Sequence, residues 1–260
     1  MQVRVGSVTD TGLRREANED SILVNAQAGV FAVCDGVGGR AGGQEASRTA
    51  VASLDRVITG GQRRAQRLEG EMLAVADAIR AAHADIRAKQ AQDPALRQMA
   101  STVAMLRLWG DYAITGHVGD CRVFHIGNDG IQRLTRDHSR VQQLIDSGRM
   151  TAEEAEKSPE RNVITRSLGV RDDIGNIDIH CVAVYPGDVF ALASDGITSY
   201  VSDGDFFVTI GERNTPPQAA CELFKQRAYD GGAHDNLSVV VVRIEESASE
   251  SLSTLATPVV

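Results

Sequence analysis

Short segments in which apolar and polar positions alternate recur along the chain and predict β-strands. Near the start, Val3 and Val5 alternate with polar or small neighbours, and two β-branched runs at 22–24 and 30–33 are separated by turn-forming residues at 25–29. Alternation of this kind, interrupted by a short polar turn, is typical of a β-hairpin. We therefore interpret the first ~35 residues as a hairpin.

The alternation of apolar and polar residues returns in the middle of the chain and again near its end. Residues 102–109 and 112–118 alternate around a turn at Gly110 and Asp111, which predicts a second hairpin. Further strands are predicted at 122–126, 131–134, 177–184, 188–193 and 237–244. The last of these is almost entirely apolar, so we expect it to be buried inside a sheet.

A helical period separates the first strands from the middle ones. Over 43–58, Ala46, Ala50 and Leu54 recur at intervals of four residues and predict one amphipathic helix. A second helix is predicted at 69–91, and a third at about 217–228, where another apolar stripe follows a proline.

The order of these elements indicates the fold class. Helices that are grouped between runs of antiparallel strands indicate an α+β layered fold, whereas an α/β fold would alternate strand and helix regularly. The segment from about 140 to 161 is polar, acidic and helical in character, and we interpret it as a small helical flap inserted between strands. We expect one domain over 1–245 and a disordered tail over 246–260, where Ser, Glu and Thr dominate.

Composition and charge remove several classes of function. The chain has 260 residues and a formal net charge of −8, which argues against a nucleic-acid backbone as the main partner. The four cysteines form no Cys-x-x-Cys pair, and no run approaches the roughly 18 apolar residues of a membrane span. The N-terminus lacks the apolar region of a signal peptide. We expect a cytoplasmic, monomeric protein with reduced cysteines.

Four aspartates stand beside glycine or asparagine in predicted turns: Asp35, Asp120, Asp195 and Asp235. At least three of them end or follow an apolar run that reads as a strand. Carboxylate, carbonyl and water oxygens are the ligands that Mg²⁺ and Mn²⁺ prefer. Several such sites in one chain indicate a two-metal centre, and such centres most often cleave phosphate esters.

Each Asp-Gly turn alone has a structural explanation, because this dipeptide is among the commonest in turns. Their order is more specific, because they belong to a series of longer motifs along the chain, at 15–21, 35–47, 101–102, 119–122, 134–139, 164–169, 194–196 and 235–238. In this order the chain resembles the metal-dependent Ser/Thr protein phosphatases of the 2C type (the PPM family), especially their compact bacterial members. The resemblance runs from about Val5 to Ile244.

The resemblance implies a fold and a set of ligands. The fold would be a central β-sandwich of two antiparallel sheets flanked by helix pairs (α-β-β-α), with metals at one end. Asp35 would bridge two Mn²⁺ or Mg²⁺ ions, with the carbonyl of Gly36 as a further ligand. Asp195 and Asp235 would hold the first ion, and Asp120 with Asp195 would form a weaker third site.

The resemblance also implies roles for neighbouring residues and partners. Glu19, Asp20 and Asn236 would support the ligands, partly through water, and Arg15 would grip the phosphate. Water shared by two cations would attack the phosphorus of a phosphoserine or phosphothreonine, without a phosphoenzyme. The substrates would be phosphorylated proteins, and a bacterial Ser/Thr kinase would be the opposing partner.

Three positions depart from the pattern of many relatives. Val37 stands where eukaryotic members have a histidine, so the general acid is open between water on a metal ion and His138. Cys121 replaces a serine, either as a tolerated small residue or as a site of inhibition by oxidation or Zn²⁺. His234 stands where an acidic residue often precedes Asp235, and we expect it to tune metal affinity only.

Two other readings compete with an active phosphatase. A binding module that kept the fold and lost turnover would lack metal aspartates, whereas all four are present here. A two-metal nuclease or nucleotide hydrolase would need a basic groove with stacking aromatics, and aromatic residues make up only 4% of this chain. The phosphatase reading is therefore the one that the sequence favours.

Overall fold

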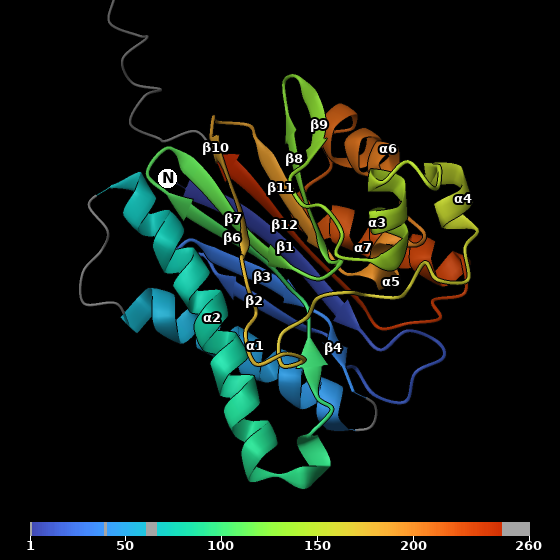
Figure 1. Ribbon diagram of the computed structural model, residues 1–260. Coiled ribbons are helices and arrows are strands. Elements are labelled where there is room, and N and C mark those ends of the chain that lie inside the picture. The colour runs from blue at the N-terminus through green and yellow to red at the C-terminus, as the bar shows by residue number, and fades with distance from the viewer. Residues whose placement is uncertain (1, 39–40, 61–66, 246–260) are drawn as a thin grey trace, which may run out of the picture.

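Two antiparallel sheets packed face to face form the centre of the molecule, with helices outside each sheet (Figure 1). The computed structural model describes residues 2–38, 41–60 and 67–245. The predicted tail at 246–260 lies outside the described residues. The layered α+β architecture confirms the fold class expected from the order of the elements.

Each sheet has five strands. The first has the order β1 (Gln2–Asp10), β12 (Leu237–Glu245), β11 (Val189–Ala193), β8 (Arg122–Gly127) and β9 (Gly130–Arg133). The second has the order β10 (Asp178–Ala183), β7 (Tyr112–Val118), β6 (Val103–Trp109), β3 (Val30–Cys34) and β2 (Ser21–Asn25). A separate two-stranded ribbon pairs β4 (Gly36–Val37) with β5 (Ala100–Ser101).

The inner faces of the two sheets share one apolar core. Phe31 and Leu106 from the second sheet pack in the same cluster as Phe190 and Val240 from the first. Every residue of β3 and of β11 is buried, because each strand has a sheet on one face and a helix layer on the other. This explains why these strands read as continuous apolar runs.

Helices cover the outer faces. On the second sheet lie α1 (Ala41–Gly60) and α2 (Leu68–Gln92), and their apolar stripes join a cluster with strands β2, β3, β6 and β7. On the first sheet lies α7 (Pro217–Asp230), with the short helices α5 (Asp195–Thr198) and α6 (Asp203–Phe206) and the π-helical turn η2 (Phe207–Glu212). Within the described residues, no helix combines the length and apolar character needed to cross a membrane.

The expectation of a single hairpin over the first ~35 residues is wrong for β1. Strands β2 and β3 form the predicted hairpin, but β1 pairs with β12, from Gln2 opposite Glu245 to Asp10 opposite Leu237. Residues 11–20 therefore cross from one sheet to the other. Alternation along a strand predicts which faces are buried but does not identify the partner strand. The sequence pattern therefore did not determine that β1 pairs with β12.

The predicted flap is a pair of short helices, α3 (Arg140–Asp146) and α4 (Ala152–Glu156). Ser139 caps α3 by accepting a hydrogen bond from the main chain, and Thr151 forms a capping box in α4. The two ends of the flap meet at an isolated bridge between Ser139 and Ile164. The helices α5 and α6, the turn η2 and the β4–β5 ribbon were not predicted, because they are too short to show a period.

Packing against the first sheet predicts an unequal effect of two neighbouring substitutions in α7. Phe224 is 1% exposed and packs against Phe206 with the two rings tilted by 48°, whereas Leu223 is 51% exposed. We expect Phe224→Ala to lower the free energy of unfolding by about 3–5 kcal/mol. Leu223→Ala should change it by less than about 1 kcal/mol. Urea unfolding followed by circular dichroism measures both, and equal effects would contradict the assigned packing.

Candidate metal centre

The four aspartates predicted to bind metal come together at one end of the sandwich. Asp35 follows β3, Asp120 follows β7, Asp195 opens α5 directly after β11, and Asp235 lies two residues before β12. The pairing of β3 with β6, of β6 with β7 and of β11 with β12 brings these strand ends to the same edge. Asp20, on the segment that crosses between the sheets, joins them.

Burial and mutual repulsion raise the pKa values of these carboxyl groups. The pKa of Asp20 rises to about 7, that of Asp120 to about 8 and that of Asp195 to about 6, in each case first because burial disfavours the charged form and then because of neighbouring charges. For Asp35 the same causes raise the pKa well above its usual range, and Asp20, Asp195, Asp120 and Asp235 all contribute. The carboxylates therefore need cations to remain ionised together.

The donor atoms at this edge fit a hard divalent cation. Buried oxygens of Asp20 and Asp195, the Oδ1 atom in each, have no hydrogen-bond partner among the described residues. Unpaired buried carboxylate oxygens are costly unless an ion or water takes them up. Because the cluster offers carboxylate oxygens, it suits Mg²⁺ or Mn²⁺ better than a soft metal.

The main chain around Asp35 is held from both sides by two hydroxyl residues. The amide of Asp35 donates to Oγ1 of Thr102 (2.9 Å), and the amide of Thr102 donates to the Asp35 carbonyl (2.8 Å). The hydroxyl of Ser101 donates to the same carbonyl at 3.2 Å. The Ser101-Thr102 motif thus positions the aspartate that is predicted to bridge two ions.

Glycine is required after Asp35 and Asp195 because other backbone lies too close. A Cβ atom on Gly36 would lie 2.1 Å from the carbonyl oxygen of Gly43, and one on Gly196 would lie 1.9 Å from that of Asn236. Any side chain at either position would displace the neighbouring main chain. The Asp-Gly pairs are therefore needed for packing as well as for turning.

Arg15, which is predicted to bind the phosphate, lies beside the cluster. Its Nη2 atom donates to Oδ2 of Asp235 at 2.8 Å, and its side chain is 51% exposed. The bond to Asp235 raises the pKa of Arg15, and the charges of Glu19 and Asp35 act in the same direction. The guanidinium therefore reaches the edge of the cluster and still faces solvent.

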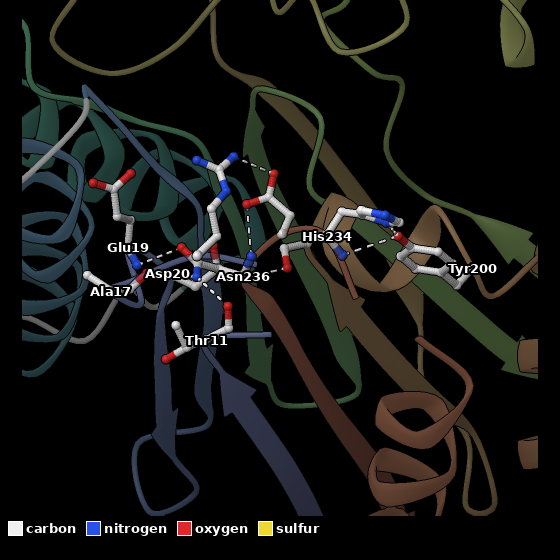
Figure 2. Close-up of polar contacts among 10 residues, drawn as sticks. Thr11, Ala17, Glu19, Asp20, Tyr200, His234 and Asn236 are labelled. Carbon is white, nitrogen blue, oxygen red and sulfur yellow. Dashed lines mark hydrogen bonds and ion pairs between the residues drawn. The ribbon is translucent and has the colours of Figure 1, made fainter. Parts of the chain in front are cut away.

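Asn236 holds the crossing segment against the start of β12. Its Nδ2 atom donates to the carbonyls of Thr11 (2.9 Å) and Ala17 (2.8 Å), and its Oδ1 atom accepts from the amide of Glu19 (2.8 Å), as Figure 2 shows. One buried side chain thus fixes three points of the segment that carries Arg15. The predicted supporting role of Asn236 has a clear geometric basis.

Two supporting residues were missed by the sequence analysis. Ser194 donates its hydroxyl hydrogen to Oδ2 of Asp20 (2.8 Å) and accepts from the amide of Ser238 (2.9 Å). Arg122 makes three hydrogen bonds to Asp137, and its charge acts on Asp120 and Asp195. Ser194 directly precedes Asp195, and Arg122 follows Asp120 by two residues. This proximity to a motif aspartate is the signal in the sequence that could have identified them.

His138 does not join the cluster. Its Nδ1 atom accepts a hydrogen bond from the amide of Gly119 (3.0 Å), and its Nε2 atom lies 2.9 Å from Oδ2 of Asp178. Burial lowers the pKa of its imidazole. Because both ring nitrogens are engaged, the arrangement gives no support to a role as general acid, which stays a prediction.

The two other departures from the family pattern have different outcomes. Cys121 is completely buried, its sulfur lies 3.1 Å from Oγ1 of Thr102, and burial raises its pKa well above the usual range. A protonated, inaccessible thiol argues against the hypothesis of inhibition by oxidation or Zn²⁺ at this residue. His234 bonds to the hydroxyl of Tyr200 (2.7 Å, Figure 2), so its effect on metal affinity would act through the position of Asp235.

Comparison with known sequences gives one matching family. The model described as protein phosphatase 2C matches residues 13–226. Protein phosphatase PhpP of Streptococcus pneumoniae is 32% identical over 95% of this chain and 100% of its own length. Serine/threonine protein phosphatase PstP of Mycobacterium tuberculosis is also 32% identical, over 93% of this chain and 45% of its own length.

Solved structures show the same architecture. The crystal structure of the M. tuberculosis phosphatase PstP/Ppp superposes with a TM-score of 0.86 at 28% identity, covering 95% of this chain and 100% of that one. A structure of the PstP catalytic domain in complex with two manganese ions gives a TM-score of 0.82, also at 28% identity, over 94% of this chain and 99% of that one.

The crowding of carboxylates predicts how stability depends on pH in the metal-free protein. The pKa of Asp120 is about 8 in the folded state and close to 3.9 in an unfolded chain. A carboxyl group whose pKa is raised by folding contributes its full stabilisation at pH values below its unfolded-state pKa. That contribution is lost as the pH rises through its folded-state pKa. We expect metal-free Asp120→Asn to be more stable than the wild type at pH 8, on the order of 2 kcal/mol, and the two to converge near pH 4.

The matched control is Asp129→Asn, at an exposed turn position, which should leave the melting temperature unchanged at both pH values. Addition of Mn²⁺ should raise the melting temperature of the wild type more than that of Asp120→Asn. A metal-free Asp120→Asn variant that is less stable than the wild type at pH 8 would contradict the assigned repulsion. Differential scanning calorimetry at pH 4 and pH 8 measures these differences.

Proposed function

The chain belongs to the protein phosphatase 2C family and is a metal-dependent Ser/Thr protein phosphatase, and we propose that its clustered carboxylates hold the ions for this reaction. The observation that supports the proposal most directly is the meeting of Asp35, Asp120, Asp195 and Asp235 at one edge, with Arg15 beside them. Two bound Mn²⁺ or Mg²⁺ ions would supply Lewis-acid charge and lower the pKa of water.

Each aspartate has a separate task in this proposal. Asp35, whose carboxylate is influenced by all the others, would lie between the two core ions, with the Gly36 carbonyl as a further ligand. Asp195 and Asp235 would bind one core ion. The pKa of Asp120 is raised by burial and then by the charge of Asp195, and the two residues would share a weaker third ion.

Arg15 would bind and orient the phosphate. Its guanidinium has five N–H donors in a planar fork, so one bond to Asp235 leaves others for phosphate oxygens. The bonds of Asn236 to the crossing segment would keep this fork in place. Positive charge fixed beside the phosphate offsets the negative charge that spreads over its oxygens during transfer.

The proposed reaction is a direct displacement. A water molecule loses one proton and its oxygen forms a bond to phosphorus, as the bond from phosphorus to the serine or threonine oxygen breaks. The serine or threonine oxygen takes up one proton, so the products are inorganic phosphate and the free hydroxyl. No protein nucleophile is required, and the buried thiols of Cys34 and Cys121, whose pKa values are raised, are unsuited to that role. No covalent phosphoenzyme is therefore part of the proposal.

The substrates would be phosphorylated proteins, and a Ser/Thr protein kinase would add the groups that this enzyme removes. The flap formed by α3 and α4 is the proposed region of substrate choice, because it is a largely exposed insertion next to the strand ends. A single copy of the chain carries all the proposed ligands and Arg15, which supports activity as a monomer.

The activity is tested by release of phosphate from a phosphothreonine peptide with and without Mn²⁺. We expect activity in the wild type only when Mn²⁺ or Mg²⁺ is present. Asp35→Asn should reduce kcat by at least about 1000-fold, because it removes the charge shared by both ions. Asp129→Asn serves as the control and should retain full activity. Equal, metal-independent release by the wild type and Asp35→Asn would overturn the proposal.

The role of Arg15 is tested against its exposed neighbour. Arg15→Ala should lower kcat/KM about 100-fold by removing the forked donor, with a rise in KM for the phosphopeptide. Arg14→Ala removes the same charge one position away and should change kcat/KM less than about threefold. The observation that would exclude the assigned role is an equal loss in both variants, since that would indicate a general effect of charge.

A further inference from the structure

One residue joins the base of the flap to the turn that carries Asp120. The amide of His138 donates to the carbonyl of Gly119 at 2.7 Å, and the amide of Gly119 donates to Nδ1 of His138 at 3.0 Å. His138 therefore bonds both the main-chain N–H and the carbonyl oxygen of Gly119, the residue that precedes Asp120. A single residue makes both contacts from 19 positions further along the chain.

The turn itself has little freedom to adjust. Gly119 has a φ of +118°, and a Cβ atom there would lie 2.5 Å from the side chain of Thr102. Thr102 in turn holds the main chain of Asp35. A shift of Gly119 would therefore change the positions of two of the proposed ligands, Asp120 and Asp35.

The imidazole of His138 is held in one orientation and one tautomer. It stacks on the ring of His117 with centroids 4.8 Å apart, and Nε2 lies 2.9 Å from Oδ2 of Asp178. Because Nδ1 accepts from an amide, the proton of the neutral ring belongs on Nε2, which donates to Asp178. The approach of Nη1 of Arg166 to Nε2 (2.9 Å) is then a contact between two donors and not a hydrogen bond. The lone pair on Nδ1 thus accepts the hydrogen bond from the amide of Gly119.

The main chain at His138 also holds both ends of the flap. Its carbonyl accepts from the amide of Thr165 at 2.7 Å, and the next residue, Ser139, forms the bridge with Ile164. The flap leaves and returns to the sandwich at this point. His138 is consequently bonded to the flap, to the Asp120 turn and to β10.

We propose that His138 is a positioning residue, whose Nδ1 atom holds the Gly119-Asp120 turn in place and ties the third ion's site to the base of the flap. The consequence for catalysis rests on the proposed function, but the positioning itself does not. The proposal replaces the general-acid role with a structural bond that can be tested separately.

A metal site is the other reading of this cluster. Ligand atoms of His117, His138 and Asp178 lie within 4.8 Å of one another. However, Nη1 of Arg166 lies 2.9 Å from Nε2 of His138 and 3.4 Å from Oδ1 of Asp178, so a cation already occupies this place. Metal binding through Nε2 would also need the proton on Nδ1, which would abolish the bond from Gly119.

Two substitutions distinguish the roles of the two ring nitrogens of His138. In His138→Asn the side-chain oxygen can take the place of Nδ1 and accept from Gly119, whereas the contact with Asp178 is lost. In His138→Gln the amide nitrogen can take the place of Nε2 and donate to Asp178, whereas the bond to Gly119 is lost. A positioning role through Nδ1 predicts that Asn rescues and Gln does not.

The direct measurement is exchange of the Gly119 amide proton in the metal-free protein, followed by NMR. We expect His138→Asn to protect this proton nearly as well as the wild type does, and His138→Gln to exchange it about tenfold faster. The amide of Ile114, within β7, is the internal reference for folding. Equal exchange of Gly119 in all three proteins would overturn the proposal.

The functional measurement is the Mn²⁺ concentration that gives half-maximal activity with p-nitrophenyl phosphate. His138→Gln should raise it about tenfold, and His138→Asn should restore most of the wild-type response. If both variants instead lose kcat equally and lose the same limb of the pH–rate profile, His138 is a general acid and the positioning role is wrong. A wild type without activity would refute the proposed function alone, since the amide exchange would still report on the bond to Gly119.

Discussion

Mutual repulsion among carboxylates is the constraint on which the rest of this structure depends. Asp20, Asp35, Asp120 and Asp195 each have a raised pKa, first because the strand ends bury the carboxyl groups and then because the fold brings their negative charges together. A fold under no functional demand would separate such groups. Among the described residues, Arg15 and Arg122 offset part of this negative charge, and the proposed ions would offset more.

The residues that hold this cluster differ in kind from those that would bind the ions. The aspartates come from strand ends, where the sheets fix the backbone. Hydroxyl and amide side chains then fix the turns: Thr102 holds Asp35, Ser194 holds Asp20, and Asn236 holds the crossing segment. Each of these side chains bonds main-chain or carboxylate atoms far away in sequence, so the site is held by the junction of the two sheets. Its precision therefore depends on sheet packing more than on any single loop.

The flap extends this organisation. Its base lies at His138, which bonds Gly119 before Asp120 as well as Thr165 on the segment that returns from the flap. An insertion attached at such a point has a physical route to the proposed third ion, whereas an insertion on a free loop would have none. The region proposed to select the substrate and the proposed site of the third ion would then both be attached to His138.

The sequence by itself determined the local elements and the chemistry. Periods of two and of about four residues predicted the long strands and helices correctly, and the ordered Asp-Gly motifs indicated a centre for hard cations. Only the tertiary structure decided the strand partner of β1, the pairing of Arg15 with Asp235, the burial of Cys121 and the hydrogen bonds of His138. Arg15 and Asp235 are 220 positions apart, and Asp20 and Ser194 are 174 apart. A local pattern shows which residues are buried or turn the chain, but contacts over such separations follow from how the two sheets pack, because only that packing brings the strand ends together.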